Sequence, residues 1–278
     1  MEHKLGKLQK KYDKRNLQFA RYISELIEPP KKIDHASRLP SNIGMMANDQ
    51  YGDCTVAAAG HMVQSWSTYA ERGLLTIGDD EILDAYFEVS PNDEGAYMLD
   101  VLKLWRNNGV GTDKIEAFAE IAPADLTQAK LAIQYFGSAY LGVALPDINT
   151  FGPWTEPNPT WAPNPYNGHA ICALAYDDST RMFDVATWGK VVKMSYGFYQ
   201  KYMDEGYAVL NDLSIIIATG KSPEGFNWAA LQDDLGHIKD PVTPPEPTSD
   251  PVVMKKYIAL AKSVDSGASW KVLLKVRV

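Results

Sequence analysis

Asn48-Asp-Gln-Tyr-Gly-Asp-Cys54 and the run that follows it, Thr55-Val-Ala-Ala-Ala-Gly-His-Met-Val-Gln-Ser-Trp66, decide how this chain of 278 residues folds. The first stretch is dense in turn-forming residues, whereas the second is apolar at spacings of three and four, which predicts a helix. Asp53 is a residue type that caps helix N-termini, so Cys54 is expected in the first turn of that helix. A thiol in this position has a lowered pKa and is a candidate nucleophile.

More helices are expected before residue 137, and short strands after it. Apolar periodicity predicts helices at 79–89, 97–108 and 126–136, and Gly73 is expected to end the helix that begins at Cys54. Strands are predicted in the short runs rich in β-branched and aromatic residues, at 139–145, 169–176, 182–188 and 207–210. Helices first and strands later indicate an α+β fold, in which a helical N-terminal half packs on an antiparallel sheet or barrel in the C-terminal half.

Prolines and charge divide the chain into four parts. Residues 1–32 are predicted to be a basic arm ending near Pro29-Pro30, residues 33–240 the main domain, residues 241–251 a proline-rich linker and residues 252–278 a second basic arm. Residues 33–250, which comprise the main domain and most of the linker, are strongly acidic, at about −18 by count of their charged residues. The last ten residues alternate between apolar and mainly basic side chains, which predicts a strand that pairs with this domain or with a second subunit.

Composition disfavours several classes of function. An acidic domain is a poor match for nucleic acid, because phosphate binding needs a clustered basic surface. No apolar run approaches the ~20 residues of a membrane span, and the polar start lacks the apolar segment of a secretory signal. The two cysteines, Cys54 and Cys172, are too few for a disulfide framework and suit a reducing compartment. We therefore expect a cytoplasmic protein, or one associated with a virion if it is encoded by a phage, without nucleic-acid or membrane partners.

His169 is the candidate partner for the Cys54 thiol. It begins an apolar strand directly after a loop, where a histidine can face a cleft. Cys172 alternates with His169 in that strand and is expected to point into the core. His61 lies on the same helix face as Cys54, but with no third ligand nearby it is expected to be a packed core histidine. No metal or other cofactor is expected.

Seven stretches carry a resemblance over about 180 residues: Pro30–Asp34, Asn48–Cys54, Glu94–Met98, the helix end Asn107–Gly109, Asp125–Leu145, Gly168–Asp177 and Thr187–Gly189. They follow, in the same order, the elements of the papain-like cysteine peptidases. The chain therefore resembles that family, and most of all its uncharacterised bacterial and phage members. The resemblance implies the two-lobed papain-like fold.

The resemblance also implies roles for individual residues. Cys54 would be the nucleophile and His169 the general base and then the general acid. The backbone N–H of Cys54 and the side-chain amide of Asn48 would stabilise the oxyanion, with Gln50 as an alternative to the shorter Asn48.

Three more residues take roles in the substrate cleft by the same resemblance. Gly95 and Ala96 would belong to the segment that binds substrate. Trp188 would shield the hydrogen bond that orients the histidine.

Two positions depart from the family pattern. Thr55 follows the nucleophile where an aromatic residue is usual, and Ala186 stands at the third position of the catalytic triad, where alanine cannot orient an imidazole. Asp184, two residues earlier on an extended strand, could orient His169 if the strand is shifted or bulged. Asp184 could equally be a solvated strand residue or a partner of Lys190 or Lys193. Asp204-Glu205 are expected to be solvated.

The sequence thus predicts a thiol hydrolase that cleaves peptide or isopeptide bonds through a thioacyl intermediate. Its partners would be peptide or protein substrates, with possible self-association through the C-terminal strand. Two alternatives are a papain-fold protein that has lost turnover and serves as a binding or virion component, and an amidase or transferase acting on cell-wall peptides.

Overall fold

The computed structural model describes residues 3–23, 27–70, 72–147, 150–155, 157–211 and 226–237. The predicted linker and the predicted C-terminal strand lie outside these residues. Helices and strands follow one another in the order η1, β1, α1, α2, α3, β2, α4, β3, β4, β5, β6, α5, β7 and α7. None of the helices in the described part of the chain is long and apolar enough to cross a bilayer.

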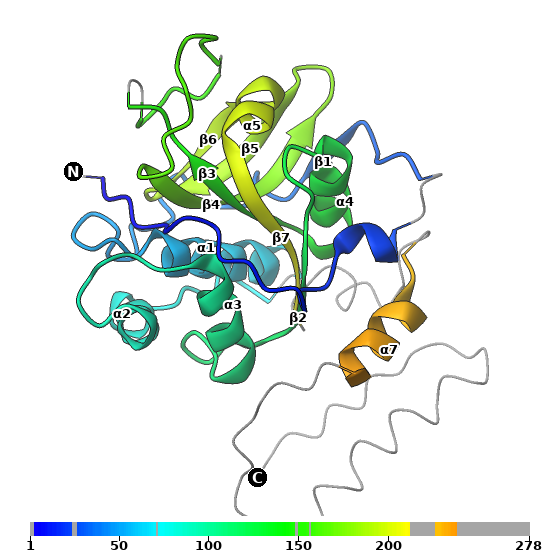
Figure 1. Ribbon diagram of the computed structural model, residues 1–278, viewed down its shortest axis with the longest axis horizontal. Helices are drawn as coiled ribbons and strands as arrows, with labels where there is room; N and C mark the ends of the chain where they lie inside the picture. The colour runs from blue at the N-terminus through cyan, green and yellow to red at the C-terminus, as the bar shows by residue number, and fades with distance from the viewer. Residues whose placement is uncertain are drawn as a thin grey trace, which may run out of the picture.

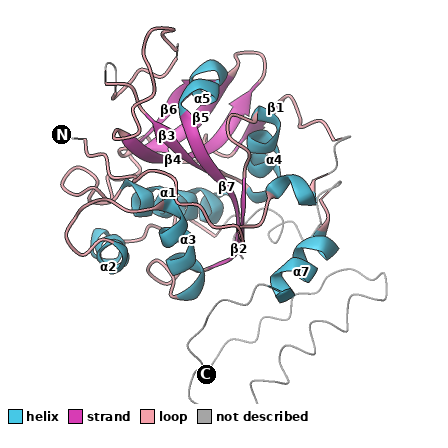
Figure 2. Ribbon diagram, in the orientation of Figure 1, coloured by secondary structure: helices cyan, strands magenta, loops and turns pink. Residues whose placement is uncertain are grey.

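The helices precede most of the strands, as the sequence predicts. The helical elements are η1 (Phe19–Tyr22), α1 (Cys54–Tyr69), α2 (Asp79–Val89), α3 (Met98–Asn107), α4 (Leu126–Phe136), α5 (Tyr196–Tyr202) and α7 (Trp228–His237). The strands are β1 (Lys32–Asp34), β2 (Ile115–Glu120), β3 (Ala139–Ala144), β4 (Gly168–Asp177), β5 (Met182–Thr187), β6 (Lys190–Ser195) and β7 (Met203–Asn211). The strands form one antiparallel sheet in the order β2-β7-β3-β4-β5-β6, with β1 paired to β4. The fold is therefore α+β, with a helical layer and a sheet (Figures 1 and 2).

Strand β4 lies between two hydrophobic cores and positions the site. Successive side chains of a strand point to opposite faces, and both faces of β4 are covered. Cys172 and Leu174 join the core that contains the buried side of α1, whereas Ile171 and Ala173 join the core that contains α4. This packing holds the start of α1 against the start of β4.

The four predicted helices and the four predicted strands are all present, some with shifted ends. The bounds of α2 and α4 match the prediction, whereas α1 ends at Tyr69 and not at Gly73. Strands β1, β2 and β6 and helices α5 and α7 are not predicted. Short mixed strands such as β2 and β6 are stabilised by pairing with a neighbouring strand and not by their own pattern.

Candidate active site

Cys54 is the first residue of α1, as predicted, and its side chain is buried. Asp53 occupies the N-cap position, but its carboxylate makes no capping hydrogen bond, which corrects the expected role of that side chain. Burial raises the pKa of Asp53 to about 8. Cys54 lies in the same hydrophobic core as Ala170, the residue after His169. The structure thus brings the cysteine to the strand that carries the histidine.

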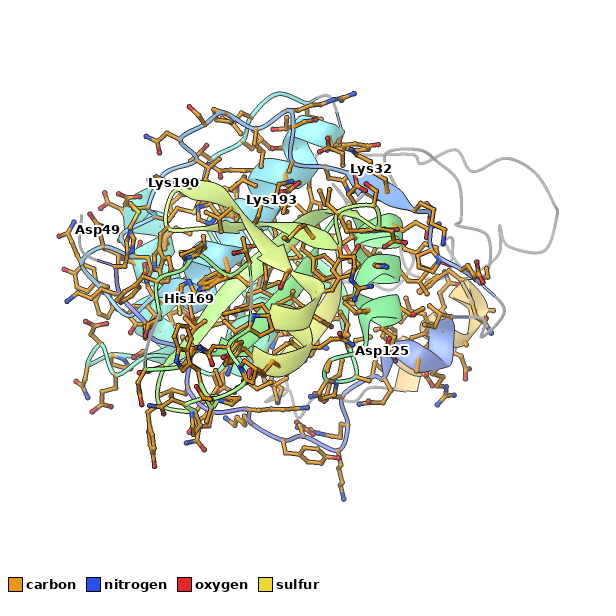
Figure 3. All side chains as sticks on the ribbon, turned by 90° about the horizontal axis from the view of Figure 1, so that it is seen from above. Lys32, Asp49, Asp125, His169, Lys190 and Lys193 are labelled. Atoms are coloured by element: carbon orange, nitrogen blue, oxygen red, sulfur yellow. The ribbon has the colours of Figure 1, made fainter. Side chains whose placement is uncertain are left out.

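His169 is buried near the start of β4, and one of its ring nitrogens is held in place. Its Nε2 lies 2.7 Å from Oγ1 of Thr187. The ring stacks on Trp188, with centroids 4.1 Å apart and planes 16° from parallel. Nδ1 has no hydrogen-bond partner among the described residues and remains available for chemistry. In Figure 3, His169 lies toward the same end of the molecule as Asp49, from the loop before α1.

Thr187, and not Asp184, is the residue that contacts the imidazole. Asp184 lies opposite Ala175 in the β4–β5 register, and its carboxylate pairs with Lys193 at 2.6 Å. The structure therefore does not bring Asp184 to His169, and the surface ion pair is the alternative that it supports. Sequence reasoning missed Thr187, although a hydroxyl directly before Trp188 was a signal that could have found it.

We expect Thr187→Val to lower turnover roughly 10- to 100-fold, since it leaves a buried ring nitrogen without its partner at about 1–3 kcal/mol. Thr187→Ser should restore the rate and its pH profile, because serine keeps the hydroxyl. Asp184→Ala is the matched control and should change the rate little, as it removes only a surface ion pair. Steady-state kinetics across pH would check this; a Thr187→Val enzyme with wild-type rate and pH profile would contradict the positioning role.

Asn48 and Gln50, the two candidates for the oxyanion side chain, lie in different environments. Asn48 is buried in the loop before Cys54, and its Nδ2 donates to the carbonyl of Tyr51 at 3.1 Å. Gln50 is exposed. The buried position makes Asn48 the better candidate of the two.

The N-terminal segment 3–8, which the cleft motifs did not predict to be near the site, lies across it. In Figure 1 its trace runs along the line where the helical layer meets the sheet. The His3 ring stacks on Trp188 at 4.6 Å between centroids, and the Trp188 indole N–H donates to the carbonyl of Lys4 at 3.1 Å. The amide of Lys4 donates in turn to the carbonyl of Asn48.

The predicted substrate segment, Gly95 and Ala96, pairs with this same N-terminal segment. Lys7 and Ala96 form a parallel β-bridge, in which the N–H of Ala96 donates to the carbonyl of Gly6 at 2.8 Å. The approach is close: a Cβ on Gly6 would lie 1.7 Å from the carbonyl oxygen of Gly52. Only glycine fits there, so a Gly6→Val chain cannot keep the segment in this place.

With the segment in place, both members of the pair are neutral at pH 7. Burial raises the pKa of Cys54 to about 12, against the opposing effect of the hydrogen bonds from the amides of Ala170 and Gly6. Burial also lowers the pKa of His169 to about 3, assisted by the charges of His3, His61 and Lys7. The sequence predicts a lowered thiol pKa, and the structure shows the opposite because the segment excludes water from the helix start.

Two other residues have the structural roles that the sequence predicts. Cys172 is buried in the core, where burial raises the pKa of its thiol. His61 is buried on α1, and its Nε2 lies 3.0 Å from the carbonyl of Gly44. Burial lowers the pKa of His61 to about 4, as expected for a neutral core histidine.

Comparisons with known proteins find the similarity in structure and not in sequence. No family model matches the chain, and no curated protein matches it. Among solved structures, it is similar to xylellain, a cysteine protease from Xylella fastidiosa, with a TM-score of 0.60, 14% identity and coverage of 76% of this chain and 97% of xylellain.

Two further solved structures have the same fold at lower identity. Procathepsin L 3 of Tenebrio molitor larval midgut gives a TM-score of 0.52 at 10% identity, covering 73% of this chain and 76% of that one. ProCathepsin B S9 from Trypanosoma congolense gives 0.53 at 11% identity, covering 74% and 85%. Together with the antiparallel sheet and the helix that begins at Cys54, these similarities show that the chain has the fold of the papain-like cysteine proteases.

Proposed function

We propose that this protein is a thiol hydrolase that cleaves peptide or isopeptide bonds through a thioacyl intermediate on Cys54. The observation that carries the proposal is the placement of a cysteine at a helix N-terminus against the strand of His169. Its Nε2 is held by Thr187, while Nδ1 has no partner in the part of the chain that the structure describes. A held imidazole with one available nitrogen is the arrangement that activates a thiol.

The proposed reaction uses the two ring nitrogens differently. When Nε2–H donates to Thr187, Nδ1 carries the lone pair that accepts the proton of the Cys54 thiol. The thiolate then attacks the substrate carbonyl carbon, and the oxyanion forms near the backbone N–H of Cys54 and the side chain of Asn48. The C–N bond breaks as His169 gives its proton to the leaving amine. Water then adds to the thioacyl carbon, His169 takes a proton from it, and the thiol is released with the carboxylic acid.

The contact with Thr187 also weighs against the alternative of a binding protein without turnover. That alternative depends on Ala186, which cannot orient an imidazole. Ala186 is buried opposite Cys172, but the next residue supplies a hydroxyl 2.7 Å from the ring. The loss of the usual third residue therefore leaves an oriented histidine.

Trapping of the thioacyl intermediate tests the proposed function. A Gly6→Val chain, with its cleft open, would be mixed with a pool of peptides, quenched in acid and analysed by intact mass spectrometry. We expect an acyl adduct on Cys54 together with cleaved peptides, both lost in a Cys54→Ala version and both kept in a Cys172→Ala version. If Cys54 reacts with iodoacetamide but forms no adduct and cleaves no peptide, the protein is a binding protein.

A further inference from the structure

The Lys7 ammonium is buried in an acidic pocket beside Cys54. Its side chain has no exposed surface, and Nζ lies 2.9 Å from Oδ2 of Asp204 and 3.1 Å from Oε1 of Glu205. Lysine is almost never buried completely unless it is paired. Burial lowers the pKa of Lys7, but the two carboxylates outweigh this effect and raise the pKa above its ordinary value.

The pocket is built to hold a long basic side chain. Glu205 is 1% exposed, although the sequence suggested a solvated carboxylate, and its Oε2 accepts from the hydroxyl of Tyr207 at 3.1 Å. Gly142, opposite Glu205 in the β3–β7 register, makes room for the lysine stem, because a Cβ there would lie 2.2 Å from Cε of Lys7. A carboxylate this deeply buried needs a cation, so an empty pocket would be costly.

Apart from the stacking of His3 on Trp188 and the packing of Leu5 against the core, the cleft binds the segment through hydrogen bonds to its backbone. The N–H of Lys7 donates to the carbonyl of Gly168 at 3.1 Å, and the N–H of Leu8 donates to the carbonyl of Ala96 at 3.0 Å. Backbone hydrogen bonds hold any extended peptide, whereas side-chain pockets select its sequence. In this cleft, the carboxylates of Asp204 and Glu205 are therefore the groups that select for a charged side chain in the bound peptide.

The segment fills the cleft without presenting a bond for cleavage. The N–H of Gly6 donates to the carbonyl of Gly168 at 3.3 Å, and the carbonyl oxygen of Gly6 accepts from the N–H of Ala96 at 2.8 Å. A carbonyl that is attacked by the thiolate places its oxygen at the oxyanion donors, whereas the oxygen of Gly6 is bound by the amide of Ala96. The N-terminal segment is thus an occupant of the site and not its substrate.

We propose that the pocket of Asp204 and Glu205 selects a lysine or arginine side chain of an extended peptide, and that Lys7 is its occupant from this chain. The substrates of the enzyme would then be peptides with a basic residue at this position, and they enter only when segment 3–8 leaves. The substrate side of this inference rests on the proposed hydrolase function, whereas the binding preference does not.

A binding experiment tests the preference without requiring turnover. Synthetic peptides of residues 3–11 would be added to the Gly6→Val protein, and protection of Cys54 from iodoacetamide would be followed by mass spectrometry. The wild-type peptide should protect Cys54 from iodoacetamide. A Lys7→Leu peptide should need a roughly 30-fold higher concentration for the same protection, the equivalent of about 2 kcal/mol of binding free energy. A Lys7→Arg peptide should still protect.

Lys11 supplies a matched control in the same peptide. Its Nζ pairs with Asp100 at 2.7 Å, but both side chains are partly exposed, so a Lys11→Leu peptide should protect like the wild type. In the protein, Glu205→Gln should make the wild-type and Lys7→Leu peptides protect Cys54 at similar concentrations. A Lys7→Glu chain is a second way to open the cleft if Gly6→Val does not fold.

Binding and turnover give separate outcomes. Equal protection by the wild-type and Lys7→Leu peptides would overturn the pocket assignment, whether or not the protein cleaves peptides. Selective protection by the lysine peptide without cleavage of any peptide would support the pocket and sink the hydrolase function.

Discussion

Cys54 of the Gly6→Val protein should react with iodoacetamide about a hundredfold faster, or more, than Cys54 of the wild type. The wild-type thiol is buried, and its pKa is raised to about 12, so almost no thiolate is present at pH 7–8. Removing the segment returns water to the N-terminus of α1. Moving the pKa back toward its ordinary value of about 8.5 increases the thiolate fraction by roughly three orders of magnitude.

Three comparisons make this prediction specific. Gly78→Val should leave the rate at the wild-type level, because a Cβ there meets only Glu81, at 3.6 Å. Lys7→Glu should accelerate the reaction as Gly6→Val does, since it places a third carboxylate beside Asp204 and Glu205. Cys172 should stay unmodified in every variant, and a protein in which Cys172 reacts first would contradict the assignment of Cys54 as nucleophile.

Replacing His169 with glutamine in the Gly6→Val protein should lower the rate of peptide hydrolysis about a thousandfold. General acid–base catalysis by a positioned side chain contributes roughly 10²–10⁴-fold. His169 is proposed to move a proton twice in each turnover, and glutamine can donate a hydrogen bond to Thr187 through its side-chain amide but cannot carry that proton. Initial rates with a basic peptide would measure the loss.

The same substitution at the other buried histidine nearby provides the control. His61→Gln keeps a donor for the carbonyl of Gly44 and should retain the rate within a few-fold. Peptide protection of Cys54 should persist in the His169→Gln protein, which shows that its cleft still binds. Equal rates for the two variants would exclude His169 as the base.

The sequence predicts the two halves of the site because each has a local signal. Cys54 stands between a turn-rich run and a helical period, and His169 stands at the start of an apolar strand. The third residue has no such signal. Asp184 and Thr187 differ by three positions on one strand, and only the register against β4 and the turn at Trp188 decide which one meets the ring.

The N-terminal segment could not be predicted from local pattern. Lys7 contacts Asp204 and Glu205 in space, although Lys7 and Asp204 are 197 residues apart in the sequence. In the sequence, each of the three residues looks like a solvated charge. The pKa of Cys54 was missed for the same reason. The helix N-terminus predicts a stabilised thiolate, but desolvation by a distant segment outweighs it.

The covalent connection of segment 3–8 to the domain also sets the concentration at which substrates can compete. The bridge between Gln18 and Glu120, together with the buried η1 helix, anchors the chain about ten residues beyond the cleft. A ligand on a short tether has an effective local concentration of about a millimolar. A free peptide of equal intrinsic affinity must exceed that concentration to displace Lys7. The intact chain should therefore bind only peptides of higher affinity, and weakly binding peptides at low concentration should bind only after the segment is lost.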